Sequence, residues 1–172
     1  MYDLRNDSFQ NNNNHFDYFI SAQRDIMTIS NTIESKRFSF EDNMETVCRC
    51  ASEAAEKMLR GYIIFNDPKA DLKGNHDLSK LYEMSVKYEP AFKGIEDELI
   101  QLNHYTTDFR YSSRFKIEKH EVKECLKNLK YIYDFPPIKK LRDELNVEKN
   151  FIKLPENINI LFGEFGQGFF LQ

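Results

Sequence analysis

Residues 44–62, METVCRCASEAAEKMLRGY, decide the fold of this chain. Their apolar side chains recur at i, i+3, i+4 and i+7, which is the spacing of an amphipathic α-helix. At about 100° per residue they share one face, and Arg49, Glu53 and Arg60 fall on the opposite face. The small residues around Ala54 would let a neighbouring helix approach closely, so this helix is expected at the centre of a bundle. The apolar face consists of Met44, Val47, Cys48, Ala51, Ala55, Met58, Leu59 and Tyr62.

Helical spacing continues on both sides of this central helix. Ser39 can cap its start, the segment 66–68 ends it, and Asn75 or Asp77 can cap the next helix. Prolines at 136–137 cannot continue a helix, so the last long helix is expected to end before them. Further helices are predicted over residues 16–33, 76–84, 90–102, 116–133 and 138–145, with a polar and aromatic connection at 104–113.

The patterns together predict an all-α fold, an up-and-down bundle of four to five helices. We expect residues 1–13 to be a flexible lead, because they lack apolar periodicity. Residues 14–148 are expected to form the bundle. Residues 149–172 form an irregular C-terminal tail, rich in aromatic residues and glycine, which is expected to pack on the bundle or on a partner chain.

Composition limits the classes of function. The chain has 172 residues, of which 41% are hydrophobic and 30% charged, as is typical of one soluble domain. It lacks an apolar run of about 20 residues and a secretory signal, so no membrane span and a cytoplasmic location are expected. A net charge of -4 argues against nonspecific nucleic-acid binding by the whole surface, so any such site is a local patch. The three cysteines are expected to be reduced thiols, and no motif indicates a metal or a cofactor.

The candidate binding surface lies in residues 110–133. On a helical wheel, five lysines share an arc of about 80° on one flank of the last long helix, and His120 lies on the solvent side of that arc. With Arg110 and Arg114 just upstream, this surface could hold a polyanion backbone. The alternative is that the lysines only cover apolar surface with their methylene stems. The five lysines are Lys116, Lys119, Lys123, Lys127 and Lys130.

Other polar residues have a structural and a functional interpretation. Arg114 and His120 could supply the cation and the proton-transfer group that metal-free RNA cleavage needs, although their spacing alone is weak support. His76 and Asp77 could form an acid–base pair, but helix capping is favoured for them. A structural hydrogen-bonding role is favoured for His104. Aromatic residues of the connection could stack on bases or anchor the loop, and they are Tyr105, Phe109 and Tyr111.

Three stretches resemble the HEPN domain family (higher eukaryotes and prokaryotes nucleotide-binding). Residues 48–61, CRCASEAAEKMLRG, are similar to the central helix of the family. Residues 75–81, NHDLSKL, look like its His-Asp-Leu helix start, and residues 105–111, YTTDFRY, resemble its Tyr-x-x-x-x-Arg-Tyr segment. They occur in the family's order and spacing, and the resemblance covers about residues 16–135.

The resemblance implies an all-α bundle that is usually a homodimer and often associated with a small nucleotidyltransferase. Catalytic members are metal-independent ribonucleases whose Arg-x4-6-His motifs from two subunits face one cleft, and Arg114 and His120 are the matching positions. Phe115 and Val122 depart from that motif.

Three functions follow from this resemblance and from the candidate surface. The first is a homodimeric module that binds RNA or a nucleotide phosphate and could belong to a toxin–antitoxin or nucleotidyltransferase-associated system. It would use Arg110, Tyr111, Lys116, Lys119, Lys123 and Lys127. The second is an endoribonuclease toxin that uses Arg114 and His120. The third is a non-catalytic interaction module.

Overall fold

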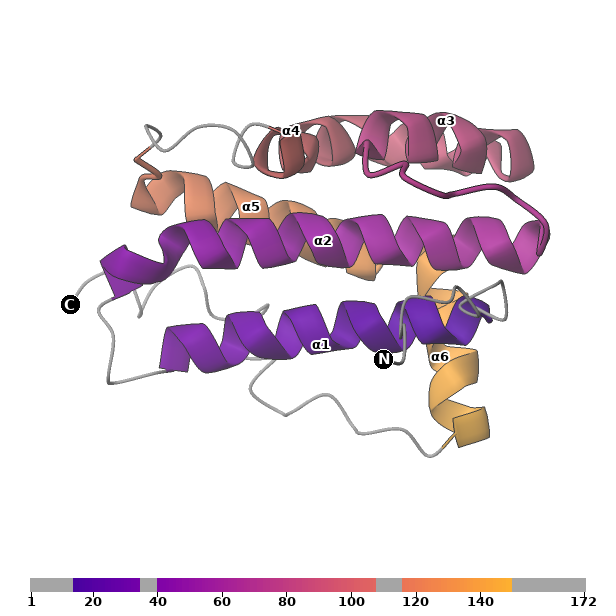
Figure 1. Ribbon diagram of the computed structural model, residues 1–172, viewed down its shortest axis with the longest axis horizontal. Helices are drawn as coiled ribbons and strands as arrows, with labels where there is room; N and C mark the ends of the chain where they lie inside the picture. The colour runs from indigo at the N-terminus through magenta and orange to yellow at the C-terminus, as the bar shows by residue number, and fades with distance from the viewer. Residues whose placement is uncertain (1–13, 35–39, 108–115, 150–172) are drawn as a thin grey trace, which may run out of the picture.

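The computed structural model describes residues 14–34, 40–107 and 116–149 (Figure 1). The described residues form six α-helices and one 3-10 helix and contain no strand, which confirms the all-α fold class. None of these helices is both long and apolar enough to cross a membrane. Both ends of the chain, 1–13 and 150–172, and Ser39 lie outside the described residues. The elements are α1 (His15–Glu34), α2 (Phe40–Asn66), α3 (Leu78–Tyr88), η1 (Pro90–Ile95), α4 (Glu96–Thr107), α5 (Lys119–Tyr133) and α6 (Pro136–Lys149).

Helix α2 is the central element of the bundle, as its alanine-rich middle predicted. It contacts α1, α3, α4, α5 and α6. Figure 1 shows α1 and α2 running antiparallel, α3 and α4 along one side of α2, and α6 crossing the direction of the other helices. Every member of the predicted apolar face of α2 is buried. Helix α5 also buries an apolar face, which consists of Val122, Cys125, Leu126, Leu129, Ile132 and Tyr133.

Gly61 lies at a close contact between α1 and α2. A Cβ atom placed on Gly61 would lie 2.8 Å from Cε2 of Phe19 and 3.1 Å from the carbonyl oxygen of His15. The Phe19 ring is fully buried, so it has little room to move aside. The absence of a side chain at Gly61 therefore allows the close packing of α1 on α2.

We expect Gly61→Ala to lower the free energy of unfolding by about 1–3 kcal/mol, because the added methyl group overpacks this contact. Gly94→Ala is the matched control, since a Cβ on Gly94 meets nothing within 4 Å. Urea unfolding followed by circular dichroism measures both effects. Equal stability of the two variants would contradict the assignment of Gly61 as a packing contact.

Several helix boundaries differ from those predicted, and the helix predicted over 90–102 is the 3-10 helix η1 followed by α4. Helix α4 continues through Thr107, so residues 104–107 are helical and not part of a connection. Helix α5 begins at Lys119, three residues later than predicted, and the side chain of Glu121 accepts the backbone N–H of Glu118 at 2.7 Å. The prolines at 136–137 stop α5 as expected, but they also open α6, because proline fits the first turn of a helix.

Candidate functional site

The lysines of α5 form an exposed, positively charged surface along one flank of the helix. We call the residues Lys116, Lys119, Lys123 and Lys127 the lysine face. Lys116, Lys119 and Lys127 are exposed and Lys123 is partly exposed. Lys116 precedes the first turn of α5, so its predicted place on the helical arc is wrong, although it stays next to that turn along the chain.

The ion pairs around α5 leave Lys127 loosely held. Its Nζ lies 3.7 Å from a carboxylate oxygen of Glu124, and both side chains are well exposed. Such pairs contribute little, so Lys127 could leave Glu124 for a phosphate at small cost. Lys130 is held more closely, at 2.5 Å from Asp134. Lys119 and Lys123 also interact with neighbouring groups.

His120 lies in the first turn of α5, where 73% of its side chain is exposed. Its Nδ1 atom is 3.2 Å from a carboxylate oxygen of Glu118, which is itself exposed. Within the part of the chain that the structure describes, the other ring nitrogen, Nε2, has no polar partner, so in this orientation it is available to a substrate. The other predicted site residues Arg110, Tyr111 and Arg114 lie outside the described residues, so the pairing of Arg114 with His120 stays a prediction.

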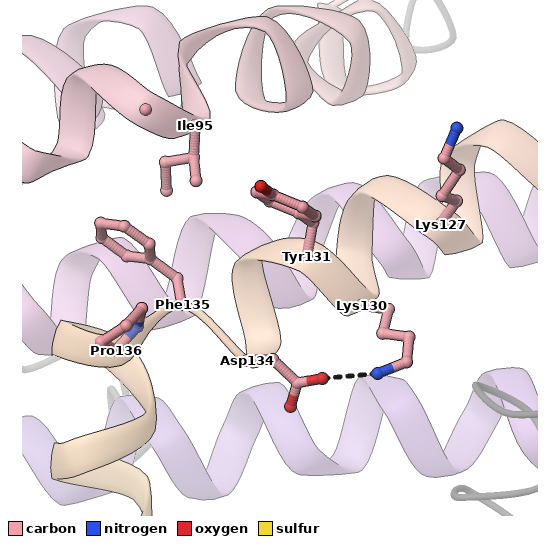
Figure 2. A pocket seen from close by; sticks show the side chains of 8 residues that line it. Ile95, Lys127, Lys130, Tyr131, Asp134, Phe135 and Pro136 are labelled. Atoms are coloured by element: carbon pink, nitrogen blue, oxygen red, sulfur yellow. Dashed lines mark hydrogen bonds and ion pairs between the residues drawn. The ribbon is translucent and has the colours of Figure 1, made fainter.

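A groove that sequence reasoning did not predict lies between η1 and the C-terminal end of α5. Its volume is about 600 Å³, within the usual range of ligand pockets. Ile95, Phe135 and Pro136 give it an apolar lining, and Tyr131 stands over this lining with an exposed ring. Figure 2 shows Tyr131 and Lys127 on the side of α5 that faces η1, and it shows Lys130 paired with Asp134, two further residues that line the groove.

A family model for the HEPN domain matches residues 19–141, which is most of the chain. The chain belongs to the HEPN domain family. The match confirms the resemblance seen in the sequence, and it includes α1 to α5, the lysine face and the start of α6. Family membership indicates a function connected with nucleotides or RNA. No curated protein and no solved structure matches the chain.

Inside the HEPN domain, a buried ionic network joins α2 to the α2–α3 connection. Glu56 and Arg60 are 6% and 8% exposed, and Oε1 of Glu56 accepts hydrogen bonds from Nε of Arg60 at 2.9 Å. Nδ1 of His76 lies 2.9 Å from the same oxygen. Arg60 also donates to the backbone carbonyl of Leu72 at 2.9 Å and to that of Asn75. Arg60 lies on the side of α2 opposite the predicted apolar face, and it is buried there because the connection folds back over it.

The capping role favoured for Asp77 is confirmed. Its carboxylate accepts the backbone N–H of Ser79 at 2.9 Å, as a cap of α3 does. Asn103 of α4 supports this turn, since its side chain accepts the N–H of Leu78 at 2.9 Å and donates to Asp77 at 3.0 Å. His76 pairs with Glu56 rather than with Asp77, so an acid–base pair of adjacent residues is not formed.

Tyr105 and the three cysteines lie buried in the HEPN core, where they are poorly suited to stack on a ligand or to act as nucleophiles. Tyr105 is buried on α4, and burial raises the pKa of its hydroxyl, so it anchors the helix and does not offer a stacking surface. All three cysteines are free and buried. Burial raises the pKa of Cys50 to about 11 and that of Cys125 well above its ordinary value, which keeps both thiols protonated at neutral pH. Protonated, buried thiols are poor nucleophiles.

Proposed function

We propose that this HEPN domain is a homodimeric cytoplasmic module that binds RNA or a nucleotide phosphate through its lysine face, together with Arg110 and Tyr111. The observation that supports this most directly is the exposed lysine flank of α5, with Lys119, Lys123 and Lys127 on one side of a single rigid helix. A rigid helix holds the ammonium groups at fixed spacing, which suits a polymer with regularly spaced phosphates.

The charge distribution supports a local phosphate site. The whole chain carries a net charge of -4, so nonspecific attraction to polyanions from the rest of the surface is weak. Binding by this protein would therefore depend on the lysine face. Such binding releases counterions from the nucleic acid and must weaken as salt rises.

The direct test is fluorescence anisotropy of labelled single-stranded RNA, titrated with the protein at low and at moderate salt. Binding that weakens steeply with salt supports the proposal. Unchanged anisotropy at low salt contradicts it, and it would leave the non-catalytic interaction module as the function. The parallel titration with a labelled nucleoside triphosphate tells whether a single nucleotide is enough.

A metal-independent endoribonuclease is the second candidate function, and the exposure of His120 favours it. In such a reaction His120 would take the proton from a ribose 2′-hydroxyl, and the freed oxygen would attack the adjacent phosphorus. The bond between phosphorus and the 5′-oxygen breaks, this oxygen takes up the proton that His120 returns, and a 2′,3′-cyclic phosphate remains, while Arg114 stabilises the negative charge on the phosphorane-like transition state. A histidine that is exposed in one chain suits an active site completed by the Arg114 and His120 of a second copy.

We expect the wild-type protein to cleave RNA in the presence of EDTA if this second function holds, and His120→Ala to slow cleavage by about 100-fold or more, because a general acid or base contributes about 10²–10⁴ in rate. His104→Ala is the matched control, since His104 is also exposed but lies on α4. Gel analysis of product formation measures all three proteins. RNA that stays intact with the wild-type protein, or equal rates for His120→Ala, would contradict an endoribonuclease.

The assembly is part of the same proposal. We propose a homodimer, a nucleotidyltransferase as a partner protein and a place in a toxin–antitoxin system. Light scattering coupled to size exclusion tests the homodimer. A monomeric mass at assay concentrations would contradict a shared cleft. Co-purification with a nucleotidyltransferase expressed together with this chain tests the second.

A further inference from the structure

The groove between η1 and α5 has the properties of a site for one flat ring. Its lining is apolar, and Phe135 is fixed by an edge-on contact with the buried ring of Phe92, whose centroid is 4.9 Å away. Tyr131 is 57% exposed, although it stands beside this lining. A large aromatic side chain that stays exposed next to an apolar floor offers one face of its ring to a ligand.

The groove also lies at the end of the positively charged flank of α5. Lys127 and Tyr131 are four residues apart and therefore neighbours on the helix surface, and His120 is two turns further back on the same flank. The rise of a helix puts His120 and Tyr131 about 16 Å apart along the axis, a span that a few nucleotides of a single strand can cover.

The charges around the groove determine on which side the phosphates of such a strand would lie. The α5 side carries Lys127 together with Lys130 and Asp134, which neutralise each other in an ion pair. On the other side, α4 begins with Glu96, Asp97 and Glu98 immediately after the residues that line the opposite wall. Phosphates are attracted to the α5 side and repelled from the start of α4. A base, which is uncharged, is the part of a nucleotide that can enter between them.

We propose that the groove binds one unpaired base of single-stranded RNA, which stacks on the ring of Tyr131 while its phosphate contacts Lys127. This inference rests on the proposed function and narrows its ligand to a single strand. Duplex RNA does not fit, because its bases are stacked on each other and cannot enter a side pocket. Base–aromatic stacking tolerates any of the four bases, so the site is expected to have little sequence preference.

The test measures anisotropy of a labelled single-stranded RNA of about ten nucleotides, within the usual range of single-strand sites. We expect Tyr131→Ala to weaken binding about 5- to 100-fold and Tyr131→Phe to change it little, because phenylalanine keeps the stacking ring. The slope of affinity against salt should stay unchanged in Tyr131→Ala, whereas Lys127→Gln should reduce it. Phe65→Ala is the matched control, since Phe65 is an exposed aromatic residue of α2 outside the groove.

The outcomes separate this inference from the proposed function. Equal binding by Tyr131→Ala and the wild-type protein overturns the stacking site and leaves binding by the lysine face intact. Failure of the wild-type protein to bind any single-stranded RNA overturns both. A change of oligomeric state in Tyr131→Ala, seen by light scattering, would assign the groove to a contact between copies and also overturn the stacking site. Circular dichroism checks that the variants keep their helices.

Discussion

Glu56→Ala is expected to lower the free energy of unfolding by about 3–5 kcal/mol, because it leaves the charge of Arg60 buried without its partner. The Glu56 carboxylate accepts from Arg60 at 2.9 Å and contacts His76 at the same distance. Domains are commonly stable by only about 5–15 kcal/mol, so the loss would be a large part of the total. Urea unfolding at neutral pH measures it.

The matched control for this prediction lies on the same helix. Arg49 and Glu53 form an ion pair at 3.1 Å with the same spacing of four residues, but 47% of the Arg49 side chain is exposed. Glu53→Ala should cost no more than about 1 kcal/mol, because exposed pairs are worth little. Similar losses for Glu56→Ala and Glu53→Ala would show that burial of the Glu56 network does not matter for stability.

A double variant separates the ionic pair from its contacts with the connection. Glu56→Leu combined with Arg60→Met should recover part of the stability lost in Glu56→Ala, because apolar residues of similar size can replace a buried ion pair. The carbonyls of Leu72 and Asn75 would still lose their donor. Faster hydrogen exchange confined to the α2–α3 connection is the expected sign of that loss.

The strongly periodic helices were predictable because their pattern is local. The apolar residues of α2 and α5 lie on faces that can be read from spacing alone, and the structure buries them as predicted. Helix ends were harder to predict. Helix α5 begins at Lys119 rather than at Lys116, because a contact between Glu118 and Glu121 fixes its start. This contact leaves the spacing of the apolar residues unchanged, so the spacing alone does not reveal it.

Arg60 shows why a wheel cannot assign every charged residue. On α2 alone it lies on the side opposite the apolar face, and the wheel does not tell whether another segment covers that side. Its partners are Glu56, one turn away, and the carbonyl of Leu72, which lies in the connection several residues after α2 ends. That connection packs on α2 only in the folded chain, so the contact is tertiary. The sequence does offer a signal, the i, i+4 pair of Glu56 and Arg60 followed by a histidine in the NHDL stretch.

The groove was not predictable for a similar reason. Its walls come from η1 and from the junction of α5 with α6, which are more than thirty residues apart in the sequence. A tyrosine at the fourth position after Lys127 is a partial signal, since on the wheel it shares the lysine flank and not the buried face. The lysine face itself was predicted from spacing. The Arg110, Tyr111 and Arg114 part of the candidate site stays a prediction.

Neutralising the lysine face is expected to have the largest effect on binding. The quadruple variant Lys116→Gln, Lys119→Gln, Lys123→Gln and Lys127→Gln removes the charges but keeps side chains of similar length. If each lysine contacts one phosphate, the slope of log affinity against log salt should fall by about 2–3, because each contact to a single strand contributes about 0.7. If Arg110 and Tyr111 also bind, the quadruple variant should keep part of its affinity at low salt.

The matched control changes the net charge equally at another surface. In this control, four other lysines are replaced by glutamine. All four are exposed and lie on α3 or in the connection before it, and these lysines are Lys69, Lys73, Lys80 and Lys87. Both quadruple variants change the net charge from -4 to -8, since -4 minus 4 is -8. Long-range repulsion of RNA is then similar in the two proteins, and only the direct contacts differ.

The salt dependence of single-stranded RNA binding, measured by anisotropy for the wild-type protein and these two variants, tests the central claim most directly. We expect the wild-type slope to be kept in the control variant and reduced by about 2–3 in the lysine-face variant. Equal slopes for the two variants would contradict the assignment of RNA binding to the lysine face of α5.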